Sequence, residues 1–510
     1  MRWLKSHWDL PQILLLAVLF AGVAVRFCFA DANSYWLDEL YSVVVYGIAH
    51  ASVVDAIREL TSSIHPPLYQ FILYNWMTVF GDSEVATRSL SNLYVLGGTL
   101  CLALAVRKIY GPWLGVIVAI VFTLMFTPTY YGMETRSYAQ TIFLSSLSTL
   151  LLTYALPRIA KKSWRGLIRD GWVYAFLATN TALLMTHYYN VLFLAAQALF
   201  FIVYLLYRDE KPLDAIVKAF AAGVTPLIAL LIAWGPVMLA SYSSRVASYV
   251  VEGLPMLPWE ILSEMVIRPN FSEYYIYYAV VALLALVTVT TLARLARRPD
   301  NETLFTLWFL LASTAPALLA FVLFFFSGHE RYNNRYFSFS VGPLAVLVVL
   351  GIYQVMMLAR RAVPVLSRAA LIVTATIGVL LAYPGGINAL QWENTDWRGI
   401  AEAIVDRIKR EPEKTFAVYE TTFRKYPTLN YYLSRFSGDV RVRDTLQMVF
   451  EGRGSIEFSP PDADYAIVAF THHKVRSFPK TLEVLEGRMK LTEKHLNKKG
   501  RGYLVFEVPK

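Results

Sequence analysis

Apolar runs of about twenty residues recur along most of this chain and leave few folds open to it. A helix needs a run of about that length to cross the hydrocarbon core of a membrane. Of the 510 residues, 56% are hydrophobic and only 16% are charged, whereas a soluble domain is closer to about a quarter charged. The sequence therefore predicts a helical protein that crosses a membrane many times.

Basic residues in the short loops orient these spans, because Lys and Arg favour the cytoplasmic side of a membrane. Arg2 and Lys5 precede the first run, and if the later runs cross in turn, every strongly basic short loop lies inside. The pattern predicts about eleven spans, a cytoplasmic N-terminus and a C-terminal part outside. The net charge of +10 does not indicate nucleic acid, because much of the excess lies in these loops. The expected spans are about residues 13–29, 89–106, 112–128, 137–156, 172–186, 191–207, 220–239 and 369–383, and three more spans lie between residues 273 and 359.

One apolar stretch, "HPPLYQFILYNWMTVFG" (65–81), is too short to cross. Its apolar part has about fifteen residues and includes Gln70 and Asn75, where about twenty apolar residues are needed. As an interfacial helix it does not change sides, so the acidic loops around Asp38 and Glu134 face the same outer side. The first run is expected to be a retained helix, because no convincing cleavage site follows it and many spans do.

After the last span the composition becomes polar. "DWRGIAEAIVDRIKR" has helical spacing, with Asp396 as its N-cap, and "FAVYE", "YAIVAF" and "GYLVFEV" have the pattern of strands. The sequence predicts a transmembrane domain over residues 1–384, with its first outer loop at 31–88, and an extracytoplasmic α/β domain over 385–510. No glycine-rich phosphate loop follows a strand, so nothing marks this domain as nucleotide-binding.

Two adjacent acids, Asp38 and Glu39, follow the first run in "SYWLDELYSVVVYG". Polar groups near a membrane are costly and tend to mark function. Carboxylates suit a general base or a divalent cation, and arginines grip phosphate. The outer face also collects His65, Arg88, Glu134, Arg136, His187, His329, Arg331 and Arg335. Together with Asp38 and Glu39, these residues fit a reaction at an alcohol or amine with a phosphate leaving group held nearby.

Each of these residues also has a structural interpretation. An Asp–Glu pair after a span is more often the start of a solvated loop or a helix cap. His65 stands before two prolines and fits a turn, and His187 fits a packed interfacial histidine. Glu134 and Arg136 fit interfacial charges, and Arg331 and Arg335 fit anchors at a helix end. Their shared side and their order along the chain favour the functional interpretation.

The order of five motifs, "WLDELYS", "HPPLY", "GDSEVATRSLS", "ETRSYA" and "RYFSFSVGP", resembles that of the C-type membrane glycosyltransferases. The likeness is to the bacterial branch related to protein O-mannosyltransferases and to the aminoarabinose transferase of lipid A, and it runs over roughly residues 10–355. "DWRGIAEAI", followed by a strand and "YYL", is similar to the extracytoplasmic domain that many bacterial members carry.

The resemblance implies an inverting transfer at the outer face of a bacterial inner membrane. The donor is a sugar linked to polyprenyl phosphate, and the acceptor is a lipid, a glycan or a protein. Asp38 matches the residue that acts as general base or orients the acceptor, with Glu39 beside it, and Glu134 matches the second outer acid, although several relatives have Asp there. No cofactor is implied except a possible divalent cation (Mg, Mn or Zn), for which Asp38, Glu134, His65 and His187 are candidates. The candidates for holding the donor phosphate are Arg331, Arg335, Arg136, Arg88 and Arg58, and those for positioning substrate are His65, Tyr69, Tyr138 and His187.

Two other functions stay open. A transporter or flippase for a lipid-linked or anionic substrate would place ionisable residues at mid-membrane, often on broken helices in matched halves. Here most charges cluster at one face, although Arg26 lies within the first run. A scaffold whose α/β tail binds a partner is the third possibility.

Overall fold

The structure is a computed structural model of the 510-residue chain. It describes residues 9–61, 65–208, 212–245, 257–268, 274–297, 299–327, 334–359, 366–393, 396–422, 429–440, 442–447, 461–470, 479–497 and 501–509. The chain forms two compact units, which are described separately. We call Met1–Ala30 with Val45–Trp392 the helical unit, and Asp31–Val44 with Glu393–Lys510 the sheet unit.

The division differs in two ways from a single boundary after residue 384. Helix α17 runs on to Leu390, and the first unit ends at Trp392. The short segment Asp31–Val44, which carries both adjacent acids, groups with the C-terminal part of the chain.

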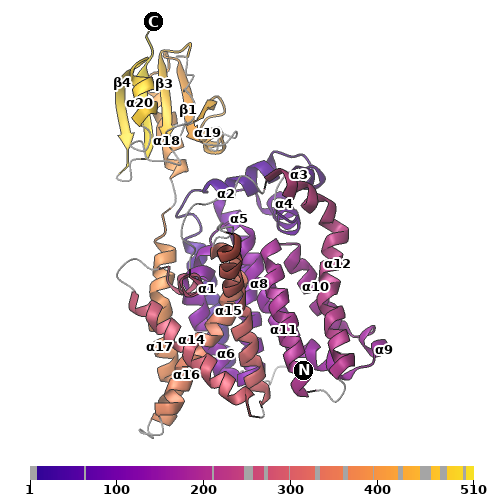
Figure 1. The fold of residues 1–510 in the computed structure, drawn as a ribbon. Helices are drawn as coiled ribbons and strands as arrows, with labels where there is room; N and C mark the ends of the chain where they lie inside the picture. The colour runs from indigo at the N-terminus through magenta and orange to yellow at the C-terminus, as the bar shows by residue number, and fades with distance from the viewer. Residues whose placement is uncertain are drawn as a thin grey trace, which may run out of the picture. The chain divides into compact units, whose positions relative to one another are not determined.

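The helical unit is built from long apolar helices that run side by side (Figure 1). Among the described residues, nine helices are long and apolar enough to span a membrane. The elements are α1 (Leu10–Cys28), α3 (Val53–Leu60), α4 (Leu68–Phe80), α5 (Glu84–Tyr110), α6 (Pro112–Leu124), α7 (Phe126–Tyr131), α8 (Ser137–Lys161), α9 (Trp164–Leu167), α10 (Gly171–Leu184), η2 (Tyr188–Asn190), α11 (Val191–Arg208), α12 (Pro212–Arg245), α13 (Pro258–Val266), α14 (Tyr274–Leu295), α15 (Asn301–Ser327), η4 (Asn334–Ser340), α16 (Val341–Ala359) and α17 (Leu366–Leu390).

These nine helices correspond to nine of the expected spans, and the fold class predicted from the sequence is confirmed. The expected spans at 112–128 and 172–186 are the shorter helices α6 and α10, of 13 and 14 residues. Helix α6 stops before Met125, whose ψ of 153° is extended. Pro128 has no N–H to donate to the carbonyl of Leu124, so a continuous helix is disfavoured and the chain restarts as α7.

Helix α4 has only 13 residues, which is about 20 Å of helix. This is shorter than the roughly 30 Å hydrocarbon core of a bilayer. The length agrees with an interfacial helix, and the side of the membrane on which it lies stays a prediction.

The centre of the helical unit is formed by α5, α6 and α8, with α16 and α17 packed against α6. The largest buried side chains of the helical unit include Trp308 and Phe309 on α15 and Phe122 on α6. Large apolar side chains on α1, α12 and α14 instead point outward, among them Phe20, Ile232 and Val289. Such outward apolar faces suit contact with lipid.

The sheet unit has a five-stranded sheet in the order β2-β1-β3-β5-β4. Strand β1 pairs in parallel with β2 and β3, whereas β5 pairs antiparallel with β3 and β4. The elements are α2 (Leu37–Leu40), α18 (Trp397–Lys409), β1 (Phe416–Thr422), α19 (Asn430–Phe436), β2 (Val442–Gln447), β3 (Tyr465–Phe470), α20 (Pro479–Glu486), β4 (Lys490–Leu496) and β5 (Gly502–Glu507), and η1 (Tyr41–Ile48) leads from this unit into the helical unit.

The helix and the three strands that the sequence predicted in this region are present. Asp396 caps α18 by accepting a hydrogen bond from the Gly399 amide at 2.9 Å. The sequence did not predict β2 or β4, which are the two edge strands. Edge strands often carry charged residues, as "KLTEKHL" does in β4, so a purely apolar pattern does not find them.

Candidate active site

Two histidines and two arginines meet at the ends of four different helices of the helical unit. The ring centroids of His65 and His187 are 5.9 Å apart, and that of Tyr138 is 6.1 Å from His187. The guanidinium carbons of Arg136 and Arg335 each lie 5.9 Å from the Tyr138 ring. We call His65, Arg136, Tyr138, His187 and Arg335 the arginine–histidine cluster.

Local structure brings these residues together. The amide of Leu68, at the start of α4, donates to the carbonyl of Met185 at the end of α10, at 3.1 Å. This bond ties the loop that carries His65 to the loop that carries His187. The backbone of Arg136 is extended and precedes α8, and its amide donates to the carbonyl of Glu134 at 2.9 Å.

The electrostatics of the cluster keep both histidines neutral. Burial and the nearby guanidinium groups of Arg136 and Arg335 lower the pKa of the His187 imidazole to about 3. Burial, the same two arginines and His187 hold the pKa of His65 well below its usual range. Two fixed positive charges beside two neutral imidazoles make a surface that favours an anion.

The turn that carries Glu134 borders this cluster. The Glu134 carbonyl accepts from the hydroxyl of Ser91 at 2.6 Å, and the hydroxyls of Thr87 and Thr135 are 2.7 Å apart. Both contacts fasten the turn to α5. Glu134 is buried, and the Tyr131 ring that precedes it lies 4.8 Å from that of Tyr138.

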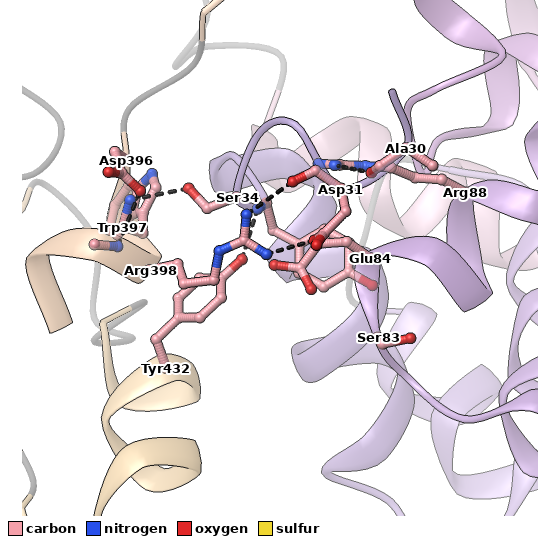
Figure 2. A network of polar contacts seen from close by, with 12 residues as sticks. Ala30, Asp31, Ser34, Ser83, Glu84, Arg88, Asp396, Trp397, Arg398 and Tyr432 are labelled. Carbon is pink, nitrogen blue, oxygen red and sulfur yellow. Dashed lines mark hydrogen bonds and ion pairs between the residues drawn. The ribbon is translucent and has the colours of Figure 1, made fainter. Parts of the chain in front are cut away.

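The other residues singled out from the sequence are less closely grouped. Arg88 is buried on α5, and its guanidinium donates to the carbonyl of Ala30 at 2.7 Å, as Figure 2 shows. Tyr69 is buried in the first turn of α4. The Arg58 side chain is 74% exposed and pairs with Asp55 at 3.0 Å. Arg331 and His329 lie outside the described residues.

The two adjacent acids belong to the sheet unit and differ in environment. Glu39 is fully buried, and its carboxylate accepts from the amide of Trp36 at 3.2 Å, as a residue in the first turn of a helix often does. Asp38 is half-buried on the single turn α2, and its carbonyl accepts from the Ser42 hydroxyl at 3.3 Å. Glu39 therefore serves the helix start, which leaves Asp38 as the better candidate for chemistry.

No protein-family model matches the sequence, and no curated protein matches it. Solved structures do match. The match to ArnT from Cupriavidus metallidurans in the apo state covers 96% of this chain and 97% of the ArnT chain, at 14% sequence identity and a TM-score of 0.54. The same protein bound to undecaprenyl phosphate has equal coverage and identity and a TM-score of 0.51. ArnT, the lipid A aminoarabinose transferase, is a C-type glycosyltransferase. This chain has the C-type fold.

The C-type fold was expected from the order of the motifs, and a divalent cation near the lipid phosphate was among the expectations. Among the described residues, no group of three or more His, Cys, Asp or Glu side chains is arranged to hold a metal ion. The two histidines that come together do so beside Arg136 and Arg335, whose positive charges oppose a cation. The residues of the cluster therefore do not fit a metal, and no chemical step is derived through one.

Two sets of contacts in the helical unit were not predicted from the sequence. The rings of Tyr189 and Tyr336 pack 4.8 Å apart and lie 5.8 and 5.1 Å from His187, so they extend the cluster's aromatic wall. Arg268 has a φ of 42° and stacks 4.0 Å from the ring of Trp392. The repeated tyrosines of "THYYN" were visible as a motif, but their direction was not.

Proposed function

We propose that this protein is an inverting glycosyltransferase that moves a sugar from a polyprenyl-phosphate donor to a lipid, glycan or protein acceptor at the extracytoplasmic face of a membrane. The observation that carries the proposal is the arginine–histidine cluster within a fold shared over 96% of the chain with ArnT. An undecaprenyl-phosphate-bound structure of ArnT makes a lipid-linked donor the natural substrate class to test.

The donor phosphate is assigned to the cluster because charge and donor groups match it. Arg136 and Arg335 each offer a planar fork of N–H donors that can hold two phosphate oxygens. The neutral imidazoles of His65 and His187 each carry one N–H, which can donate a further hydrogen bond to a phosphate oxygen. As the bond from the sugar to the phosphate breaks, negative charge grows on the phosphate, and these groups stabilise it.

Asp38 is assigned the role of general base. The acceptor hydroxyl or amine attacks the anomeric carbon, its proton passes to the Asp38 carboxylate, and the bond from that carbon to the phosphate oxygen breaks. Polyprenyl phosphate leaves with the electron pair of that bond. One displacement inverts the anomeric centre, so no covalent enzyme intermediate is needed. Glu134 is the second acid and the candidate for orienting the acceptor.

The test is transfer by the purified chain in lipid nanodiscs, with a panel of radiolabelled undecaprenyl-phosphate sugars and a membrane extract as acceptor. We expect release of undecaprenyl phosphate, and Asp38→Asn lowers kcat by about 100- to 10,000-fold. Asp55→Asn, an exposed acid on α3, is the matched control and keeps the parent rate. Mass spectrometry of surface glycans and lipids, with and without the gene, then identifies the acceptor. Movement of the lipid across proteoliposomes without sugar transfer would instead establish a flippase.

The proposed location of the reaction has its own test. We place the N-terminus in the cytoplasm and the loop between α4 and α5 outside, because the basic short loops then all lie inside. On a background with Cys28 and Cys101 replaced, Ser83→Cys should react with a membrane-impermeant thiol reagent added to intact cells. Reaction only after permeabilisation would reverse the assignment.

A further inference from the structure

The segment that carries Asp38 is held by α18 and α19 of its own unit, as Figure 2 shows. The guanidinium of Arg398 pairs with the carboxylate of Asp31 and donates to its carbonyl at 2.8 Å. The amide of Trp397 donates to the hydroxyl of Ser34 at 2.9 Å. These contacts fix the start of the segment against the first turn of α18.

A third contact lies closest to the acid. The amide of Tyr35 donates to the phenol oxygen of Tyr432, on α19, at 2.6 Å. Tyr35 is 0% exposed and Tyr432 is 1% exposed, so this bond is shielded from water. The ring of Tyr35 also packs 5.7 Å from that of Tyr431. Two neighbouring tyrosines of α19 therefore hold Tyr35, the residue that precedes Trp36 and the short helix α2.

Helix α2 (Leu37–Leu40) runs directly into η1 (Tyr41–Ile48), so the helical stretch that carries Asp38 has four plus eight, or twelve, residues. An isolated helix of fewer than about 12–15 residues is only marginally stable in water. Contacts with other parts of the chain must therefore support its conformation. Three contacts, at Asp31, Ser34 and Tyr35, supply such support just ahead of it.

We propose that Arg398 and Tyr432 are positioning residues for Asp38: they fix the backbone ahead of α2, so that the carboxylate is held at one place for proton transfer. The inference rests on the proposed function, because Asp38 is the base only in that reaction. It gives the C-terminal part of the chain a role in catalysis through a segment near the N-terminus. A base must be within hydrogen-bond reach of the proton it takes, and a misplacement of about 1 Å costs about 100-fold in rate.

The experiment measures position and rate separately in the full chain. Tyr432→Phe removes one oxygen and keeps the buried ring, and Arg398→Ala removes the ion pair. Arg398→Lys is the conservative variant, which keeps the charge. Hydrogen exchange of the peptide covering residues 31–44 reports the position, and kcat and KM for donor and acceptor report the reaction. The matched controls are Tyr503→Phe, whose hydroxyl contacts Ala403 at 3.4 Å, and Arg410→Ala, exposed at the other end of α18.

We expect both test variants to exchange faster at residues 31–44 and to lose about 10- to 100-fold in kcat, with KM for the donor unchanged. Arg398→Lys should restore part of kcat, and both controls should match the parent. Unchanged exchange in both test variants overturns the proposal, and so does faster exchange with the parent kcat. A parent chain that turns over no polyprenyl-phosphate sugar contradicts the proposed function itself, and this is seen before any variant is compared.

Discussion

The side chain of Arg26 lies so close to Gly132 that a methyl group added at Gly132 would be 2.5 Å from its Cδ atom. Arg26 is 2% exposed, and its Nε donates to the Asn92 side chain at 2.8 Å. Asn92 in turn donates to the carbonyl of Val23 at 3.0 Å. A charge within the first apolar helix thus joins α1, α5 and the turn before Glu134. This gives Arg26 a structural role and removes a feature that favoured a transport path.

Gly132→Ala should therefore destabilise the protein. The added methyl group meets Arg26 and the Pro128 carbonyl, 2.9 Å away, and overpacking of a buried site costs about 1–3 kcal/mol. Thermal unfolding in detergent measures the loss. Gly171→Ala is the matched control, because no atom lies within 4 Å of its added methyl group. Equal melting temperatures for the two variants would contradict the close packing.

Arg335→Lys should weaken the use of the lipid donor. A lysine keeps the charge but cannot hold two phosphate oxygens in a planar fork. Hydrogen bonds to charged groups contribute about 1.5–3 kcal/mol, so we expect a loss of about 10- to 100-fold in kcat/KM for the donor. Arg165→Lys, at an exposed position on α9, is the control. Parent kinetics for Arg335→Lys would make that residue a helix anchor and move the test to Arg136.

The lowered pKa of His187 predicts a loss of stability in acid. Above about pH 6.5 its imidazole is neutral in both the folded and the unfolded chain. Below that pH only the unfolded chain takes up the proton, until the pH reaches the folded value of about 3. The free energy of unfolding should therefore fall as the pH falls, by about 2 kcal/mol at pH 5 from this group alone.

His187→Asn isolates this contribution. Asn can still accept the hydrogen bond from the Tyr189 amide that His187 Nδ1 accepts at 3.3 Å, but it does not titrate. His65 has a lowered pKa as well and is present in both the parent and the His187→Asn variant. The contribution of His187 is therefore the difference between the two proteins in how the free energy of unfolding changes with pH. Curves that stay parallel from pH 7.5 to 5 would show that His187 is protonated in the fold.

Arg407→Met should destabilise the sheet unit. Arg407 is buried and pairs with Glu493 at 2.7 Å and Glu411 at 2.9 Å. Removing one partner of a buried pair costs about 3–5 kcal/mol. Because the two glutamates are about one-third exposed, we expect only about 1–3 kcal/mol. Lys490→Met, which is 80% exposed, should change stability by about 0.5 kcal/mol or less.

The same pair has a defined pH window. Burial raises the pKa of the Glu493 carboxyl, but hydrogen bonds from His495 and Arg407 outweigh it and leave the pKa lowered. The stabilisation is therefore present above the unfolded value of about 4.3 and is lost as the pH falls through the folded value. The difference between parent and Arg407→Met should shrink in that range. A difference that is constant with pH would assign the effect to lost packing of the arginine stem.

The apolar periodicity was enough to predict the helical unit, because the length of each run is set by the membrane and not by contacts with distant residues. It did not show where a local residue ends a helix early. The helix that begins at Pro112 ends before Met125, ahead of Pro128, and α10 ends before the extended backbone of His187. In the sheet unit, central strands such as β3 are continuous apolar runs, whereas the edge strand β4 alternates with charge and was missed.

The candidate site was predictable only as a set of residues on one face. That His65 meets His187 depends on the bond between Leu68 and Met185, which has no signature in sequence. Arg58 was chosen for its charge, and its exposure is a property of the fold. Adjacent acids look equivalent in a sequence, but in the fold the Glu39 carboxylate accepts a hydrogen bond from the amide of Trp36 at the start of α2.

The segment Asp31–Val44 and its anchors are also separated in time. The three contacts join residues 363, 367 and 397 positions apart. At about 5–20 residues per second of synthesis, α18 and α19 follow the segment by roughly 20 to 80 seconds. Until then the region around Asp38 is present without the contacts that hold it. The nascent chain therefore carries its acid early and acquires these three anchors only after residues 397–432 have been made. A chain that stops after α17 has the nine candidate spanning helices of the described residues and lacks all three anchors.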